Sequence, residues 1–205
     1  MKRAIFIDRD GILNEMVYDE NHGLLDSPRR SEQVYMIKGA GTFLKKIREA
    51  GYVSIVVTNQ PGIAKGTLTL EELSQVNDEL ARQLETEGGA WDDLIFSPYH
   101  PKPGRHGRIE YTRDSDCRKP GPGMLIAAAR KHGIDLSSSW MIGDGTVDIQ
   151  AGRAAGCRTI LVTSLKISQV EQFFDLHQAM PDAVVKNLEK AWNTISGQST
   201  RQVHE

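Results

Sequence analysis

Two aspartates stand one residue apart at the end of the first apolar run of the chain. Residues 3–7 predict a short strand, and Asp8-Arg9-Asp10-Gly11 follows it directly. Two neighbouring carboxylates repel each other and would repel a phosphate more, so they suit an anionic substrate mainly when a hard cation neutralises them. With Mg²⁺, one carboxylate could attack phosphorus while the other gives a proton to the leaving oxygen and later takes one from water. A solvated acidic turn is the alternative for this motif alone.

Two further segments could bind the oxygens of a phosphate group. Thr58 and Asn59 follow a predicted strand and supply a hydroxyl and an amide, although a threonine there also suits a simple helix cap. Lys119, preceded by Arg118, stands just before a predicted helix, where an ammonium group and a helix N-terminus can stabilise a transferring phosphoryl group. A surface lysine without a function is the alternative for this segment alone.

Asp144 and Asp148 add two carboxylates after a later predicted strand. They are the natural remaining Mg²⁺ ligands, although a solvated loop would look similar in isolation. The order Asp-x-Asp-Gly, Thr-Asn, Lys-Pro and Gly-Asp-x-x-x-Asp, each placed at a strand end or a helix start, indicates one site rather than four unrelated loops. The combination predicts a Mg²⁺-dependent phosphatase.

The elements that must position these residues alternate between short β-branched runs and longer segments of helical period. This alternation predicts an α/β fold with a doubly wound, mainly parallel sheet, in which ligands bind at the carboxyl ends of the strands. We expect one domain over residues 1–196 and a frayed polar tail over 197–205. The predicted strands are 3–7, 53–57, 94–96, 140–142 and 159–162, and the predicted helices are 39–50, 70–87, 124–132, 149–155, 167–176 and 184–195.

Two stretches, residues 15–38 and 98–119, lack clear periodicity, and loops this long in a small domain are usually functional or mobile. They are too short to hold a large cap domain, so substrate specificity must come from loops, including residues 62–69. Lys65, Arg105 and Arg108 lie on these loops and could bind a second phosphate, although surface cations are usually only solvated.

The composition restricts the partners. The chain has 205 residues with 25 basic and 27 acidic side chains, so no basic field exists for nucleic acid or an anionic membrane. The N-terminus enters a predicted strand without a signal-like apolar region, which favours a cytoplasmic location. A small phosphorylated metabolite is the expected partner.

The four motifs, in this order, resemble those of the haloacid dehalogenase (HAD) superfamily. Three longer strings, FIDRDGILN, TNQPGIAKG and DCRKPGPGM, are similar to its subfamily IIIA, which includes the D-glycero-D-manno-heptose 1,7-bisphosphate phosphatases and the histidinol-phosphatase domain. The resemblance covers the chain from residue 5 to about residue 185. It implies a HAD-like fold without a large cap domain and an aspartyl-phosphate intermediate.

The resemblance also implies a role for each matching residue. Asp8 would be the nucleophile, Asp10 the general acid/base, and Thr58 and Lys119 the phosphate-binding residues. The Mg²⁺ ligands would be Asp8, the Asp10 backbone carbonyl and Asp144, with Asp148 and Asn14 in support, while Arg118 and Asn59 would contact substrate or phosphate.

One departure from this subfamily concerns zinc, which its members usually hold in the loop before Arg-Lys-Pro. The matching positions here are Ser97, Tyr99, Ser115 and Cys117, so one of four soft ligands remains, and tetrahedral zinc needs its full set. We therefore expect Mg²⁺ without zinc.

Several substrates fit these residues. The first hypothesis is removal of the 7-phosphate from D-glycero-D-manno-heptose 1,7-bisphosphate. Histidinol phosphate or another small phosphorylated sugar or alcohol is the alternative, and phosphotransfer to an acceptor other than water would use the same residues. A non-catalytic phospho-sugar binding protein would retain Thr58 and Lys119 but lose a carboxylate, whereas Asp8 and Asp10 are both present.

Overall fold

A six-stranded parallel sheet forms the centre of the molecule. The computed structural model describes residues 1–20, 23–175 and 179–197. The strand order is β5-β4-β1-β6-β7-β8, and every neighbouring pair is parallel, which confirms the predicted doubly wound sheet. The strands are β1 (Ala4–Ile7), β4 (Val53–Asn59), β5 (Asp93–Ser97), β6 (Trp140–Gly143), β7 (Arg158–Val162) and β8 (Ala183–Val185).

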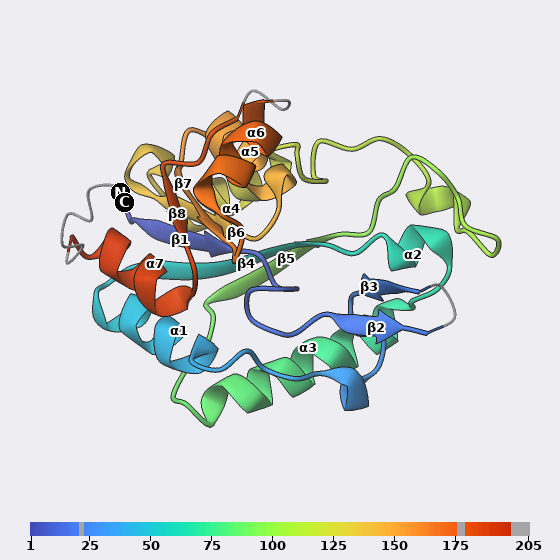
Figure 1. The fold of residues 1–205 in the computed structure, drawn as a ribbon. Coiled ribbons are helices and arrows are strands. Elements are labelled where there is room, and N and C mark those ends of the chain that lie inside the picture. The colour runs from blue at the N-terminus through green and yellow to red at the C-terminus, as the bar shows by residue number, and fades with distance from the viewer. Residues whose placement is uncertain (21–22, 176–178, 198–205) are drawn as a thin grey trace.

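Helices cover both faces of this sheet (Figure 1). Successive side chains of a strand point to opposite faces, so Ile5 and Ile7 pack on one side and Ala4 and Phe6 on the other, and all four are fully buried. Strands buried on both faces read as continuous apolar runs, as β1 does. One face is covered by α1 (Ala40–Glu49), α3 (Leu70–Glu85) and α7 (Leu188–Ile195), and the other by α4 (Gly123–His132), α5 (Thr146–Ala155) and α6 (Ile167–Asp175).

The longest helix, α3, shows why these segments are helical. Its apolar side chains Leu73, Val76, Leu80 and Leu84 recur at helical spacing and are buried against the sheet side. At its start, the Thr69 side chain accepts from the Glu72 backbone N–H at 3.1 Å and the Glu72 carboxylate accepts from the Thr69 backbone N–H at 2.7 Å. This capping box satisfies two of the free N–H groups at the helix start.

The end of the chain differs from the prediction of one helix over residues 184–195. Ala183–Val185 forms β8, which pairs with β7, and α7 begins only at Leu188. A three-residue apolar run is too short to show a period, and pairing with β7 decides its conformation. The Asn187 side chain accepts from the Lys190 backbone N–H at 3.0 Å, which starts the helix at this point. The predicted frayed tail lies, except for Gly197, outside the described residues.

The two stretches without periodicity contain short elements that the sequence did not predict. Residues 15–38 hold an antiparallel hairpin, β2 (Val17–Asp19) and β3 (Leu24–Asp26), and a 3-10 turn, η1 (Ser31–Gln33). Two further short elements are α2 (Gly62–Lys65) and the 3-10 turn η2 (Ile109–Tyr111) within the 98–119 loop. A 3-10 turn, η3 (Leu136–Ser138), precedes β6. The hairpin and α2 both lie on the side of the molecule to which β1 and β4 point (Figure 1).

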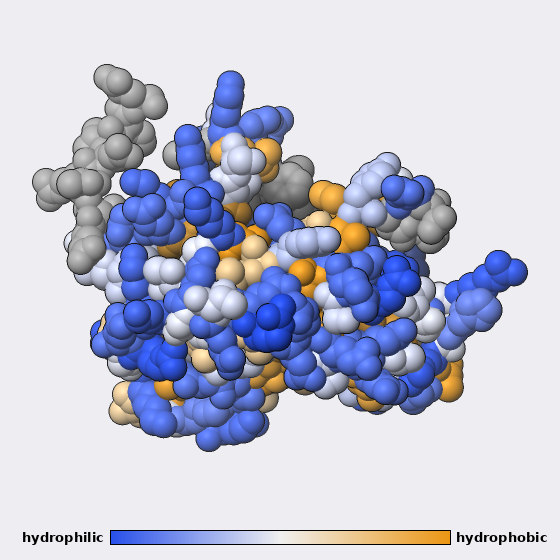
Figure 2. All heavy atoms as spheres, turned by 90° about the horizontal axis from the view of Figure 1, so that it is seen from below, coloured by the Kyte–Doolittle hydropathy of each residue, from blue (hydrophilic) through white to orange (hydrophobic). Residues whose placement is uncertain are grey.

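The surface over α1 and α3 is mostly hydrophilic, with hydrophobic residues scattered singly or in small groups (Figure 2). Within the described parts of the chain, no helix has both the length and the apolar character required to cross a bilayer.

Candidate active site

The predicted carboxylates meet where the sheet changes direction. The chain leaves β1 toward β4 on one side and leaves β6 toward β7 on the other, so the ends of β1 and β6 form the topological switch point, where α/β folds bind ligands. Asp8 follows β1, while Asp144 and Asp148 follow β6. These three side chains each place an oxygen within 4.8 Å of those of the other two.

Two glycines permit this close approach. Gly11 has a φ of +83°, and a Cβ atom there would lie 2.2 Å from Asp144 Oδ2. Gly143 ends β6, and a Cβ atom there would lie 2.3 Å from three atoms of the Asp148 side chain. Side chains at these positions would collide with the carboxylates, so both motifs require glycine for a steric reason.

Lys119 is the buried cation of the site. Its ammonium group lies 2.8 Å from Asp8 Oδ1 and 2.6 Å from Asp148 Oδ1, and it donates to the Val57 carbonyl at 2.8 Å. The Asn59 side chain makes two hydrogen bonds to the backbone of Lys119. The Asn59 amide oxygen accepts from the Lys119 N–H, and the Asn59 amide nitrogen donates to the Lys119 carbonyl, each at 3.0 Å. Asn59 therefore positions Lys119, and its predicted contact with substrate stays a prediction.

The charge balance of this cluster is unfavourable without a further cation. Burial and the nearby Asp148 charge raise the pKa of Asp8 to about 7 despite Lys119, and burial together with the Asp8 charge raises the pKa of Asp144 to about 6. Burial alone would lower the pKa of Lys119, but Asp148 and Asp8 outweigh it and raise that pKa above its ordinary value. Three clustered carboxylates, which only one ammonium group partly neutralises, offer the oxygen ligands that Mg²⁺ prefers.

Asp10 lies outside this cluster and is surrounded by hydrogen-bond donors. Its Oδ1 accepts from Arg9 Nε at 3.1 Å, Arg9 Nη2 at 2.9 Å and Asn14 Nδ2 at 3.0 Å. Its Oδ2 accepts from Ser27 Oγ and Gln60 Nε2, both at 2.9 Å, and from Arg9 Nη2 at 3.1 Å. Burial would raise the pKa of Asp10, but the Arg9 charge and these bonds lower it below its usual value.

Three residues near Asp10 had no role assigned from the sequence. Arg9 is fully buried and is itself anchored by Asn77 of α3, whose side-chain oxygen accepts from Arg9 Nη1 at 2.7 Å. Gln60 donates to Thr58 Oγ1 at 2.9 Å as well as to Asp10, so it links the predicted phosphate-binding hydroxyl to the predicted acid/base. Both adjoin predicted motifs and could have been found there. Ser27 lies in a stretch without any pattern, so no local signal pointed to it.

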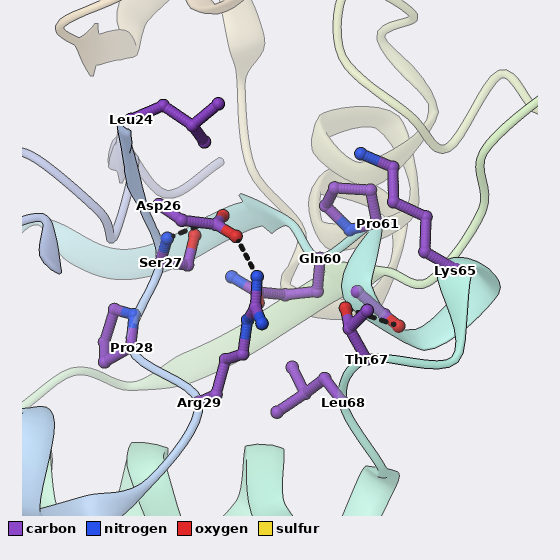
Figure 3. A pocket seen from close by; sticks show the side chains of 11 residues that line it. Leu24, Asp26, Ser27, Pro28, Arg29, Gln60, Pro61, Lys65, Thr67 and Leu68 are labelled. Atoms are coloured by element: carbon purple, nitrogen blue, oxygen red, sulfur yellow. Dashed lines mark hydrogen bonds and ion pairs between the residues drawn. The ribbon is translucent and has the colours of Figure 1, made fainter. Parts of the chain in front are cut away.

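A pocket of about 240 Å³ opens beside Asp10, between the segment after β3 and the segment around α2. Ser27 and Gln60 line it together with Asp26 and Arg29 on one side and Lys65 on the other (Figure 3). Of the three cations predicted to contact a second phosphate, Lys65 lines this pocket, whereas Arg105 and Arg108 do not.

Known proteins share this arrangement of elements. The HAD-hydrolase-like family model matches residues 116–191. The chain is 36% identical over 167 residues to a D-glycero-beta-D-manno-heptose-1,7-bisphosphate 7-phosphatase of Pasteurella multocida, an alignment that covers 81% of this chain and 84% of that protein. It is also 36% identical over 160 residues to a D-glycero-alpha-D-manno-heptose-1,7-bisphosphate 7-phosphatase of Burkholderia mallei, covering 78% of this chain and 79% of that one. The chain belongs to the family of HAD-like phosphatases.

A solved structure supports the same membership. The D,D-heptose 1,7-bisphosphate phosphatase from B. bronchiseptica, complexed with magnesium and phosphate, superimposes with a TM-score of 0.74 at 26% identity. The match covers 97% of this chain and 100% of that one. The likeness therefore extends over nearly the whole chain.

In this HAD-like chain, the loop over residues 98–119 is held by side-chain and backbone packing. The Arg113 guanidinium lies 4.3 Å from the centre of the Tyr99 ring, and the Tyr99 and Tyr111 rings are 6.1 Å apart. Arg118 is half-buried, which lowers its pKa, and its Nη1 donates to the Tyr99 carbonyl at 3.4 Å.

The same loop packs against α2 without space for side chains. A Cβ atom at Gly66 would lie 2.0 Å from the His106 carbonyl oxygen, and one at Gly104 would lie 2.3 Å from the Lys65 carbonyl oxygen. Tyr99 is engaged in stacking, Cys117 is exposed, and Ser97 is buried. These side chains do not fit a tetrahedral zinc site, because they offer a single soft ligand.

Replacement of Gly11 by alanine should weaken Mg²⁺ binding. The added Cβ would collide with Asp144 Oδ2, so we expect the dissociation constant for Mg²⁺ to rise by about tenfold or more in isothermal titration calorimetry. Gly23→Ala is the matched control, because Gly23 also has a positive φ, of +66°, while its nearest atom is Tyr18 Oη at 4.0 Å. Equal Mg²⁺ affinity in the two variants would contradict this account of Gly11.

Proposed function

We propose that this chain is a Mg²⁺-dependent phosphomonoesterase that works through a phosphorylated Asp8. Its proposed substrate is D-glycero-D-manno-heptose 1,7-bisphosphate, from which it removes the 7-phosphate. The observation that carries the proposal is the position of Asp8 at the switch point, 2.8 Å from the Lys119 ammonium and within one acidic cluster with Asp144 and Asp148. A carboxylate placed beside a cation and a metal-binding set suits nucleophilic attack on phosphorus.

The chain's own residues supply a nucleophile, an acid/base and phosphate-binding groups. An Asp8 oxygen attacks phosphorus, the bond from phosphorus to the leaving oxygen breaks, and that oxygen takes a proton from Asp10. Water then attacks the phosphoryl group and gives a proton to Asp10, and the bond from phosphorus to Asp8 breaks to release inorganic phosphate. Lys119 and Thr58 bind the phosphoryl oxygens during both steps.

The Mg²⁺ ion would be held by Asp8 and Asp144, with Asp148 beside them. When bound, it supplies positive charge that allows an anionic ester to approach an anionic nucleophile. Asp148 also keeps Lys119 in place through the 2.6 Å ion pair.

The choice of substrate is supported by the pocket beside Asp10 and by the relatives. Lys65 and Arg29 both line the pocket, and cations of this kind could contact the second phosphate of a bisphosphate. Arg29 Nη2 also donates to Asp26 Oδ2 at 2.5 Å, so its orientation is fixed. Relatives of similar identity are named for both the alpha and the beta anomer. The anomer is therefore left open in the proposal.

Asp8→Asn should abolish turnover while phosphate still binds. The amide cannot form the phosphoryl-enzyme bond, so we expect kcat to fall by about a thousandfold or more in assays of phosphate release. Asp93→Asn is the control, since Asp93 binds Lys131 and His132 near the start of β5, away from the switch point, and should leave kcat unchanged. Substantial turnover by Asp8→Asn would exclude the covalent mechanism.

A substrate panel tests the heptose assignment. It contains both anomers of heptose 1,7-bisphosphate, histidinol phosphate, fructose 1,6-bisphosphate and an aryl phosphate. One heptose anomer should exceed the others in kcat/KM by about a hundredfold. Lys65→Met should raise KM for the bisphosphate and leave KM for the aryl phosphate unchanged. Slow and similar rates on every substrate would retain the phosphatase chemistry but reject the heptose substrate.

We further infer that catalysis requires Mg²⁺ and no zinc. Removal of metal with a chelator should abolish phosphate release, and Mg²⁺ alone should restore it fully. Purified protein should contain less than about one zinc per ten chains by elemental analysis, because one exposed thiol cannot form a structural zinc site. Zinc at one equivalent per chain, with loss of thermal stability on its removal, would contradict this inference.

A further inference from the structure

Ser27 connects residues 15–38, which we call the β2–β3 insert, to the proposed acid/base. Its hydroxyl donates to Asp10 Oδ2 at 2.9 Å, although the two residues lie 17 positions apart in the chain. The same side chain lines the pocket beside Asp10 (Figure 3). Ser27 therefore lines the pocket and also donates a hydrogen bond to the Asp10 carboxylate.

The segment that carries Ser27 is fixed by its own hydrogen bonds. Asp26 Oδ1 accepts from the Ser27 backbone N–H at 2.8 Å, and Asp26 Oδ2 accepts from Arg29 at 2.5 Å. The Gln33 side-chain oxygen accepts from the backbone N–H of Arg29 at 2.9 Å. Pro28 further restricts the backbone between them. A hydroxyl presented from such a segment has a defined position.

The two oxygens of Asp10 have different surroundings. Among the described residues, Oδ1 accepts from Arg9 and Asn14, which belong to the same motif as Asp10. Oδ2 accepts from Arg9 as well, at 3.1 Å, and also from Ser27 and Gln60, which both line the pocket. Oδ2 is therefore the oxygen nearest the pocket walls. Gln60 reaches it from the end of β4, so among the donors to Asp10 that the structure describes, Ser27 alone comes from the insert.

We propose that Ser27 is a positioning residue that aligns Asp10 Oδ2 with the oxygen of a leaving alcohol bound in this pocket. The proposal rests on the phosphatase function set out above and adds a residue to it. In the first chemical step, the bond between phosphorus and the alcohol oxygen breaks, the Asp8–phosphorus bond forms, and the alcohol oxygen takes a proton from Asp10. Misplacement of Oδ2 slows this transfer without weakening substrate binding.

The leaving group provides a readout that a merely structural role would not change. An alkyl alcohol needs a proton as it leaves, whereas a 4-nitrophenolate leaves without one. Ser27→Ala should therefore lower kcat about tenfold on a sugar phosphate, with KM changed less than about twofold. On 4-nitrophenyl phosphate, the rate of the first step, measured as the burst of 4-nitrophenolate, should change by less than about twofold. Ser27→Thr keeps the hydroxyl and should restore most of the rate on the sugar phosphate.

Ser31→Ala is the matched control within the same segment. Ser31 is partly buried, and its hydroxyl donates only to the Glu32 side chain among the bonds described, so its loss should leave both rates unchanged. Ser27→Cys, which keeps a weak donor of similar size, serves if Ser27→Ala does not fold, and should show an intermediate loss on the sugar phosphate alone.

The outcomes separate this proposal from the one on which it rests. Equal losses in the rate of the first step on both substrates, no loss on either, or no rescue by threonine would overturn the role of Ser27. If the unchanged protein releases no phosphate from any ester with Mg²⁺, the phosphatase function itself fails. A loss confined to the sugar phosphate and restored by threonine supports the proposal.

Discussion

The contact between the buried Lys119 ammonium and the two carboxylates of Asp8 and Asp148 is the constraint on which the site depends. One positive charge lies at 2.8 and 2.6 Å from two negative ones, in a place from which water is nearly excluded. Asp144 adds a third carboxylate, so three negative charges face one positive charge. The difference equals the charge of one divalent cation, which is a physical reason for a magnesium site that does not depend on any relative.

The carboxylates can lie this close together because glycines, which have no side chain, face them at the switch point. β1 and β6 are neighbours in the sheet, and at Gly11 and Gly143 a Cβ atom would collide with the Asp144 and Asp148 side chains. Lys119 reaches the same point from a separate loop, and Asn59 clamps its peptide to the end of β4. Segments from the ends of β1, β4 and β6 and from the loop that carries Lys119 thus meet at the switch point.

Asp10 is held differently from Asp8, and the difference matches their proposed roles. Asp8 has an oxygen close to Lys119 and the acidic cluster, where attack on phosphorus would occur. One oxygen of Asp10 accepts from donors of its own motif, and the other accepts from Arg9 of that motif and from two residues that line the pocket. The surrounding chain, not their own chemistry, therefore distinguishes these two carboxylates, in keeping with the different roles proposed for them.

The sequence by itself determined the fold class and the approximate places of five of the six strands of the sheet, and it named most of the residues that the structure brings together at the candidate site. These follow from local signals: apolar β-branched runs, helical periodicity, and motifs that adjoin a predicted strand end. The tertiary structure decided what has no local signal. The run at Ala183–Val185 became a strand only by pairing with β7, and the 15–38 stretch became a hairpin whose neighbour Ser27 meets Asp10. Contacts between segments distant in the chain depend on packing geometry, which no short window of sequence contains.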